Sequence, residues 1–480
     1  MLDSQGYTRL GMRRGVTLLA CLAAGLIFTM PSSAAVPLRT AIVDPPHFNA
    51  SGSGQALAFQ RTRAVGASMA RLNLTWGEVS PHDRPPGFDS ADHRSPGYNW
   101  ARFDRQVIAA VNAGLTPIVS ISYAPSWAEG PGAGSPGTRN PNAVEFGRFA
   151  RAAATRYSGS YVPPDAEPTW AEPLPAVRYW QAWNEPNRDY FFRPQYRGRS
   201  LVSPGLYRAM VNRFAAGVRP VHPANKVIAG GLAPLGRPGK PGPMPFMRAF
   251  LSQRADFDIW AHHPYTSGGP THRAPNKNDV SLGNLPTMRA LLRSSARTGR
   301  VGSRGPVAFW VTEFSWDTKG PDPRGVPTAL HARWTSEALY RMWRSGVSLV
   351  TWYRIQDDPL RATPYQSGFF TAAGARKRSL TAFRFPTVAF GERGGLVVWG
   401  RTPTSAAGSV VVEIKTGRSW RRLGTLRANS GGIFSKTFRT PYRKGHVRAR
   451  FARETSVPFS LTRVANRYVN PFGCGGTIPC

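Results

Sequence analysis

The chain alternates short apolar runs with longer amphipathic stretches from about residue 38 to residue 360. Apolar runs bounded by turn residues predict buried strands, and stretches with a 3.6-residue apolar period predict helices. Eight such runs occur, at residues 40–44, 70–76, 116–123, 177–185, 226–232, 257–265, 307–314 and 348–355. Repeated strand and helix units predict an α/β fold with parallel strands, and eight of them predict a closed (β/α)8 TIM barrel.

The clearest helix candidates lie between these runs, at residues 103–114, 145–157, 206–218 and 331–346. Gly closes several of them, as is common at helix C-termini. In a barrel of this class, the residues that do chemistry lie at the carboxyl ends of the strands. We therefore expect the functional site in the loops that follow the apolar runs.

The pattern changes after residue 380. Short alternating runs separated by Gly, Ser, Arg and Asn are typical of antiparallel strands, and they occur at residues 395–400, 409–415, 432–438 and 446–453. The prediction is a barrel over residues 36–388 and a small all-β, sandwich-like module over residues 389–480.

This predicted module is strongly basic. From residue 391 it carries sixteen Lys or Arg residues against three Glu. A sheet face with Arg421, Arg422, Arg448 and Arg450 could hold an anionic polymer. A solvated packing module is the alternative.

Residues 1–35 have the form of an export signal: three Arg residues precede the apolar run 16–30, and small residues follow near Ala34 and Ala35. Fifteen apolar residues are few for a membrane span. We therefore expect cleavage, a secreted or cell-surface protein and no stable span afterwards, with an uncleaved anchor as the alternative. Cleavage leaves Cys474 and Cys480, and an oxidising compartment favours a disulfide between them.

The formal net charge is +36, from 62 Lys and Arg against 26 Asp and Glu. A polyanionic partner, such as an anionic wall polymer or an acidic glycan, is one explanation, and Arg-rich solvated surfaces are the other. The basic residues are scattered rather than clustered, and no nucleic-acid-binding motif occurs. We expect no nucleic acid partner.

Two glutamates stand out as candidate catalytic residues. Glu185, in the motif WNEPN, ends the fourth predicted strand, and Glu313, in WVTEFSW, ends the seventh. The ends of these strands face each other across a barrel mouth. That arrangement can place two carboxyl groups about 5 to 5.5 Å apart, the separation that a retaining glycosidase requires.

With these motifs in this order, residues 40–385 resemble the clan A glycoside hydrolases, in particular families 39 and 5. The resemblance implies that Glu185 is the acid/base, that Glu313 is the nucleophile and that Asn184 holds the 2-hydroxyl of the sugar. It also implies that Arg71 on the second strand pairs with the nucleophile. His263 and Tyr265 match the family's sixth-strand His and Tyr, and Trp352 matches its eighth-strand Trp under the sugar.

Physical chemistry gives the same division of roles. Arg71 and the Tyr265 hydroxyl near Glu313 would stabilise its ionised form, and Glu185, facing that charge, is expected to hold its proton. Trp76 and Trp127 are candidates to stack against a sugar ring, with packing in the core as the alternative. The loops 131–138 and 158–173 match no pattern of the family, and we expect them to lie over the mouth and select the substrate.

The sequence predicts no metal and no other cofactor, because two carboxylates suffice for glycoside cleavage. The predicted function is a secreted retaining glycoside hydrolase acting on a poly- or oligosaccharide. Two alternatives stay open. One is a non-catalytic glycan-binding protein on a glycosidase barrel, and the other is an envelope protein that binds an anionic polymer through its basic surface.

Overall fold

Eight parallel strands close into a barrel, as the eight apolar runs predict. The computed structural model describes residues 37–164, 172–320, 322–359, 365–464 and 467–469. The strands are β1 (Arg39–Val43), β2 (Met69–Thr75), β3 (Thr116–Ser122), β4 (Tyr179–Ala182), β7 (Lys226–Leu232), β8 (Ile259–His262), β9 (Ala308–Val311) and β10 (Leu349–Tyr353). Their spatial order is β1-β10-β9-β8-β7-β4-β3-β2, with β1 also paired to β2, so the α/β barrel fold is confirmed.

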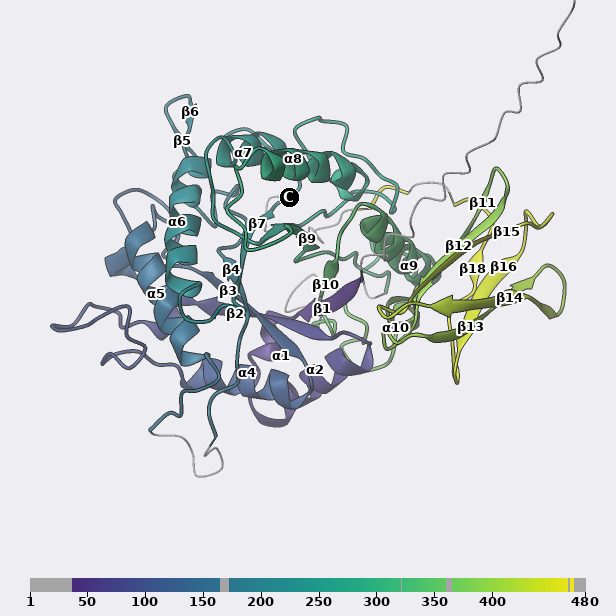
Figure 1. Ribbon diagram of the computed structural model, residues 1–480, viewed down its shortest axis with the longest axis horizontal. Helices are drawn as coiled ribbons and strands as arrows, with labels where there is room; N and C mark the ends of the chain where they lie inside the picture. Colours follow the sequence, from purple (N-terminus) through teal and green to yellow (C-terminus); the bar gives the residue numbers. More distant parts are fainter. Residues whose placement is uncertain (1–36, 165–171, 321, 360–364, 465–466, 470–480) are drawn as a thin grey trace, which may run out of the picture. The chain divides into compact units, whose positions relative to one another are not determined.

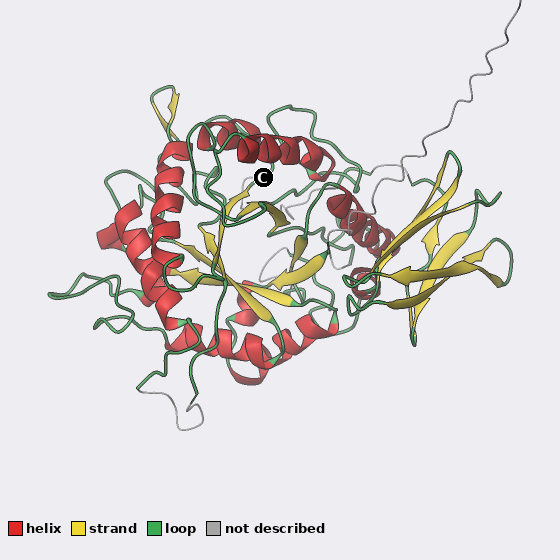
Figure 2. Cartoon of the chain, viewed as in Figure 1, coloured by secondary structure: helices red, strands yellow, loops and turns green. Residues whose placement is uncertain are grey.

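Helices surround the strands (Figure 2). The longer ones are α2 (Gly52–Ala64), α4 (Ala101–Asn112), α5 (Ala143–Arg156), α6 (Ser203–Val218), α7 (Pro243–Phe250), α8 (Leu285–Arg297), α9 (Thr328–Arg344) and α10 (Arg378–Arg384). Short ones are α1 (Pro45–Phe48), α3 (Trp76–Val79), η1 (Ser126–Ala128) and η2 (Leu282–Asn284). In α4, Phe103, Val107 and Ala110 are buried at a spacing of three to four residues, which turns one face of the helix to the barrel.

An apolar layer fills part of the barrel interior. It consists of Ala41, Met69, Ile118, Ile228, Ile259, Ala261, Trp310 and Leu349, one or two from almost every strand. Side chains alternate between the two sides of a strand, so residues two positions further along also point into the barrel. This places Arg71 above Met69, and it places His263 above Ala261 on the side of the carboxyl ends.

The C-terminal part is all-β, as predicted (Figure 1). One antiparallel sheet contains β11 (Thr387–Glu392), β12 (Gly395–Arg401) and β15 (Ile433–Phe438). The other contains β14 (Trp420–Ala428), β13 (Gly408–Lys415), β16 (His446–Phe451) and β17 (Glu454–Thr455), with β18 (Phe459–Ser460) also paired to β16. Alternating buried residues such as Val410, Val412 and Ile414 form the inner face of this second sheet.

The strand register separates the arginines that the sequence grouped together. Arg422 and Arg448 both lie opposite Glu413, on the outer face of the sheet, and Arg450 lies opposite Val411 on the same face. Arg421 instead lies opposite Ile414, whose side chain is buried on the inner face. The predicted four-arginine face is therefore wrong for Arg421, because neighbouring residues on a strand point to opposite sides.

Buried contacts join this module to the barrel. Arg401 has no exposed surface and donates to the carbonyl of Leu38 and to the Thr40 hydroxyl, both at 3.1 Å. Arg384 of α10 forms a two-bond ion pair with Glu454, with both distances 2.7 Å. These contacts fix the start of the first barrel strand against the module.

Two sequence predictions fall on residues outside the described ranges. These are the export signal over residues 1–35 and the disulfide between Cys474 and Cys480. None of the helices in the described ranges combines the length and the hydropathy of a membrane span.

Candidate active site

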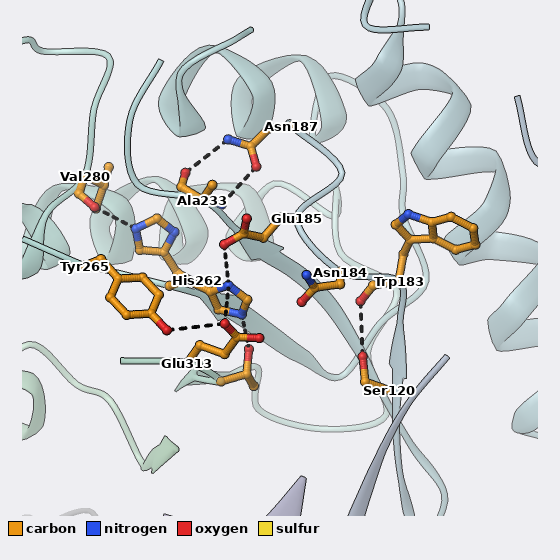
Figure 3. A network of polar contacts seen from close by, with 12 residues as sticks. Ser120, Trp183, Asn184, Glu185, Asn187, Ala233, His262, Tyr265, Val280 and Glu313 are labelled. Atoms are coloured by element: carbon orange, nitrogen blue, oxygen red, sulfur yellow. Dashed lines mark hydrogen bonds and ion pairs between the residues drawn. The ribbon is translucent and has the colours of Figure 1, made fainter. Parts of the chain in front are cut away.

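Glu185 and Glu313 point toward one another from opposite sides of the barrel mouth (Figure 3). Glu185 follows β4, the fourth barrel strand, and Glu313 follows β9, the seventh. One carboxylate oxygen of each lies within 4.8 Å of the other and of a ring nitrogen of His263. Oxygens this close favour the separation of about 5–5.5 Å between carboxyl groups that retaining glycosidases use over the about 6.5–9.5 Å of inverting enzymes.

Backbone contacts fix Glu185 in a turn. Its φ is +39°, an uncommon value for a residue with a side chain. The Glu185 N–H donates to the Gly231 carbonyl at 3.1 Å, and the Glu185 carbonyl accepts from Arg188 N–H at 2.8 Å. Asn187 ties the same turn to the end of β7, because its side chain donates to and accepts from the Ala233 backbone (Figure 3). The turn therefore presents the Glu185 side chain in one direction.

Strained backbone clusters at this end of the barrel. Trp183 and Tyr123, which follow β4 and β3, have φ values of +69° and +59°. The indole N–H of Trp183 donates to the Phe191 carbonyl at 2.9 Å, and its carbonyl accepts from Gln181 Nε2 at 3.0 Å. Such conformations persist only where the surrounding structure holds them, and they gather at functional sites.

Three groups stabilise the ionised form of Glu313. Arg71 donates to Oε1 in a buried ion pair, the Tyr265 hydroxyl donates to Oε2 at 3.4 Å, and His263 Nδ1 lies 3.8 Å from Oε2. Burial alone would raise the pKa of Glu313, but His263, Arg71 and these hydrogen bonds outweigh it and lower that pKa below its ordinary value. A carboxylate with a lowered pKa is ready to act as a nucleophile.

His263 lies beneath both glutamates and is fully buried. Its Nδ1 is 2.9 Å from Glu185 Oε1, and its Nε2 is 3.0 Å from the Thr312 hydroxyl. Gly231 lies beside this ring: a Cβ there would be at an ordinary contact distance of 3.5 Å from His263 Nε2 but only 2.8 Å from Gln181 Nε2. The imidazole is thus oriented by Thr312 and bonded to the candidate acid/base.

Asn184 shares the Arg71 guanidinium with Glu313. Arg71 donates to Asn184 Oδ1 at 2.9 Å and to the Ser120 hydroxyl at 3.1 Å. Because the carbonyl oxygen of the Asn184 amide is engaged, its NH2 group faces outward as a donor. The structure thus brings together six residues that the sequence proposed: Arg71, Asn184, Glu185, His263, Tyr265 and Glu313.

Glu185, His263 and Glu313 also form a possible set of metal ligands, the one group of this kind within the described part of the chain. A cation among them would lie close to the Arg71 guanidinium and would displace the hydrogen bonds that now hold both carboxylates. These three residues are therefore better suited to act as two hydrogen-bonded carboxylates beside a histidine than as the ligands of a metal ion.

Trp352 does not lie under a sugar site, as the resemblance implied, and Trp76 takes the core position that the sequence left open as the alternative. Trp352 has no exposed surface; it packs on His331 and Phe383 of the outer helices, and its indole N–H donates to the Ser367 carbonyl at 2.8 Å. Trp76 is also fully buried and stacks on Phe149, with ring centroids 5.4 Å apart. Neither can contact a sugar, because both side chains point from the barrel toward the helices.

Trp127 keeps part of its surface exposed. Its indole N–H donates to the Pro81 carbonyl at 3.1 Å, and its ring meets Phe88 and Trp76 edge-on. It therefore belongs to the packing of the loops at the rim, with one side open to solvent.

Tyrosines supply the aromatic surface near the glutamates instead. Tyr353 is the neighbour of Trp352 on β10 and so points into the barrel. Burial, followed by the charges of Glu185 and Glu313, raises the pKa of Tyr123 to about 12. Burial also raises the pKa of Tyr353 and Tyr365, with Glu313 contributing to both. The alternation of side chains along β10 could have identified Tyr353 as a residue that points into the barrel. No sequence signal identifies Tyr365 as part of the site.

The two unusual loops lie in different places. Loop 131–138 follows β3, packs on Tyr123 and lines a cavity of about 450 Å³ with residues after β4. Loop 158–173 instead leads from α5 into the start of β4, so it enters the opposite end of that strand. Its Tyr161 lies 4.2 Å from His93 and lines a cavity of about 1090 Å³ beside α4. The described part of this second loop, residues 158–164 and 172–173, does not cover the mouth as predicted, since a segment that precedes a strand joins its amino end; residues 165–171 lie outside the described ranges.

No protein-family model matches the sequence, and no curated protein matches it either. Among solved structures, the fold is similar to a family 39 glycoside hydrolase from Bacteroides cellulosilyticus WH2, with a TM-score of 0.51, 15% identity and coverage of 84% of this chain and 81% of the other.

Two further structures overlap with lower scores. A glucosidase from Croceicoccus marinus has a TM-score of 0.48 at 14% identity, and a family 30 endoxylanase from Clostridium papyrosolvens C71 has 0.46 at 11%; each covers 84% of this chain and 94% of its own. At 15% identity, the family 39 similarity concerns the fold. The chain therefore has the (β/α)8 fold of the clan A glycoside hydrolases that its WNEPN and WVTEFSW motifs resemble.

Proposed function

We propose that the chain is a retaining glycoside hydrolase in which Glu185 is the acid/base and Glu313 is the nucleophile. The observation that carries the proposal is the approach of these two carboxylates to within 4.8 Å at the ends of the fourth and seventh strands. Tyr265 and the buried Arg71, both bonded to Glu313, support the assignment of the nucleophile.

The proposed reaction has two displacements. In the first, a Glu313 oxygen bonds to the anomeric carbon, the glycosidic C–O bond breaks, and the proton of Glu185 passes to the leaving oxygen. In the second, Glu185 takes a proton from water, the water oxygen bonds to the anomeric carbon, and the ester bond to Glu313 breaks. Arg71 and Tyr265 stabilise the Glu313 carboxylate before attack and when it leaves.

Other residues would bind and orient the sugar. The NH2 group of Asn184 is a donor close to both carboxylates, and Tyr123, Tyr353 and Tyr365 offer aromatic faces beside them. Aromatic walls with a few directional polar groups suit a carbohydrate. His263 acts through Glu185 as a positioning residue, because it is buried and bonded to that carboxylate.

The test is hydrolysis of a panel of aryl glycosides and polysaccharides by residues 36–480. Glu185→Ala should lower kcat by about 10²–10⁴-fold on substrates with poor leaving groups. Glu313→Ala should be at least as inactive, and added azide should restore turnover and give a glycosyl azide of inverted configuration. The exposed Glu78, paired with Arg102, supplies the matched control variant Glu78→Ala. Full activity of either catalytic variant would overturn the assignment. Saturable binding of a glycan without hydrolysis would favour the non-catalytic alternative.

We further propose that the protein is secreted after cleavage near Ala35, on the strength of the charged and apolar pattern of residues 1–35. Expression of the full chain in a bacterial host should give a protein outside the cytoplasm whose sequence begins near residue 36. Recovery of the chain with Met1 in place, in the cytoplasm, would contradict this.

We also propose that the outer face of β13, β14 and β16 holds an anionic polymer. The register places Arg422, Arg448 and Arg450 on this face around a single carboxylate, Glu413. Glutamine at all three positions should weaken retention on an anionic polysaccharide at low salt. Arg421→Gln, on the other face, is the matched control. Retention that salt does not weaken would contradict the proposal.

A further inference from the structure

A second concave surface lies on the same side of the barrel as the two glutamates. The cavity of about 450 Å³ is lined by residues 131–133, 139–140, Asp189 and 193–196, which follow β3 and β4, together with Gly239 after β7. All of these segments leave the carboxyl ends of their strands. Its volume falls within the range of small-ligand sites, about 300–1,000 Å³.

Backbone hydrogen bonds build this cavity. Arg193 N–H donates to the Thr138 carbonyl at 2.8 Å, and Asn140 N–H donates to the Arg193 carbonyl at 2.7 Å. These bonds place Arg139 and Arg193 side by side as an isolated bridge. Both guanidinium groups line the cavity, and about a third or more of each side chain is exposed.

The charges around the cavity leave a positive excess. Arg139 is paired with Glu129 at 2.6 Å, whose side chain is almost fully buried. Arg193 and Lys240 share one carboxylate, Asp189, at 3.4 and 3.1 Å. Arg139, Arg193 and Asp189 line the cavity, and with their ion-pair partners Lys240 and Glu129 the group has three cations and two carboxylates. An anion in the cavity would gain hydrogen bonds from guanidinium groups that are already held in place.

Tyr190 connects the cavity with the candidate active site. It follows Asp189 in the chain, and its ring is 5.7 Å from Lys240 Nζ and packs on Phe191, which in turn packs on Tyr123. Tyr190 keeps 46% of its surface exposed, so its ring offers an aromatic platform for a sugar next to the cavity.

We infer that this cavity is a distal subsite that binds the carboxylate of a hexuronate residue in an oligosaccharide substrate, with Arg193 as the main ligand and Tyr196 as an apolar wall. The inference rests on the proposed glycosidase function and names its substrate class as an acidic glycan. Arg139 contributes less, because its bonds to Glu129 already engage it.

Binding to an inactive variant tests the subsite apart from catalysis. Glu313→Gln serves as the background, and calorimetry measures its affinity for tetrasaccharides that contain glucuronate, galacturonate or mannuronate and for their neutral counterparts. We expect at least one acidic tetrasaccharide to bind more tightly than its neutral counterpart, and high salt to reduce the difference. Arg193→Gln should weaken that binding by about tenfold.

Two further variants make the result decisive. Arg193→Gln leaves Asp189 paired with Lys240, so no buried charge is stranded. Arg193→Lys keeps the charge and should retain most of the affinity. Arg197→Gln, in the exposed hairpin of β5 (Tyr196–Arg197) and β6 (Ser200–Leu201), makes the same charge change outside the cavity and should bind within about twofold of its parent.

Equal binding of acidic and neutral tetrasaccharides, or equal losses in Arg193→Gln and Arg197→Gln, would overturn the subsite. Such a result would leave the catalytic proposal intact. Failure of the catalytic proposal would show separately, as absent hydrolysis by the wild-type protein on the acidic tetrasaccharide that binds.

Discussion

Arg71 and Glu313 form an ion pair inside the barrel, between its second and seventh strands, and the arginine side chain is 1% exposed. A guanidinium in this position cannot be solvated by water, so its partner carboxylate and its bonds to Asn184 and Ser120 must satisfy it. The pair thus links the charge of the candidate nucleophile to the amide that faces the substrate.

Replacement of Arg71 should change the pH dependence of activity. Arg71 helps to lower the pKa of Glu313, so Arg71→Gln should raise that pKa and move the acidic limb of the kcat/KM profile to higher pH. The substitution should also lower the free energy of unfolding by about 3–5 kcal/mol, because the buried Glu313 carboxylate loses its ion-pair partner. A pH–rate profile checks the shift, with the exposed Arg102→Gln as control. If the acidic limb of the kcat/KM profile stays at the same pH in Arg71→Gln, Arg71 does not set the pKa of Glu313.

Asp317 should make the protein less stable as pH rises. Burial raises the pKa of Asp317 to about 7, and Lys377 and the hydrogen bond from Gln366 N–H offset burial only in part. A carboxyl with a raised folded pKa binds its proton more tightly in the folded state, so stability falls between about pH 4, its unfolded pKa, and about pH 7. Asp317→Asn should remove this loss, on the order of 4 kcal/mol above pH 7, since each pKa unit of difference corresponds to about 1.4 kcal/mol.

Thermal unfolding of wild type and Asp317→Asn at both ends of this pH range measures the difference. Asp83→Asn, at a side chain that is 93% exposed, should leave the pH dependence unchanged. Parallel curves for wild type and Asp317→Asn would show that Asp317 is ionised in the folded protein throughout.

Neighbouring residues of β10 should behave oppositely on substitution. Trp352→Phe removes a buried bond to Ser367 and leaves a small cavity, so it should cost about 1–3 kcal/mol of stability without a change in KM. Tyr353→Ala should raise KM or lower kcat/KM about tenfold, because its side chain points into the barrel at the end of the strand where the two glutamates lie. Chemical denaturation and steady-state kinetics separate the two effects. A change in KM in Trp352→Phe would show that Trp352 does affect substrate binding.

Gly231→Ala should lower kcat as well as stability. Its φ is +62°, and a Cβ would lie 2.8 Å from Gln181 Nε2, so both the strained backbone and the side-chain contact oppose alanine. The Gly231 carbonyl accepts the Glu185 N–H, so a shift of this strand displaces the acid/base. Gly299→Ala, at φ +71° with open space around it, is the matched control for backbone strain alone. Equal effects on kcat in the two variants would rule out the contact as the cause.

The barrel could be predicted because each strand lies in a short, largely apolar run between turn residues. The run 226–232 coincides with β7, and every other barrel strand falls within two residues of its predicted run or inside it. In the C-terminal module, β14 escaped prediction because seven of its nine residues are exposed or half-buried and its apolar alternation is broken by a bulge in the pairing of β13 with β14. Exposed strands carry too few buried positions for a clear pattern.

The polar part of the site could be predicted because the motifs WNEPN and WVTEFSW contain its two glutamates. Its aromatic part could not, since a tryptophan near a catalytic motif is as suited to the core as to a substrate. Trp352 and Tyr353 show the distinction, because neighbouring residues on a strand point to opposite sides. Leu349 points into the barrel, so the period of two predicts that Tyr353, four residues later, points inward and that Trp352 points outward. Tyr365 comes from a loop whose path depends on tertiary contacts alone.

The pairing that closes the barrel joins Arg39 to Leu349, in the first and the last of the eight barrel strands. During synthesis, β1 emerges first and lacks one neighbour until more than 300 further residues have been made. Until then the growing sheet has two open edges, which are templates for pairing with other chains. Such distant contacts slow folding. The nascent chain therefore depends on the cell to shield its edges, and a truncation before residue 353 would yield an aggregating fragment rather than a smaller barrel.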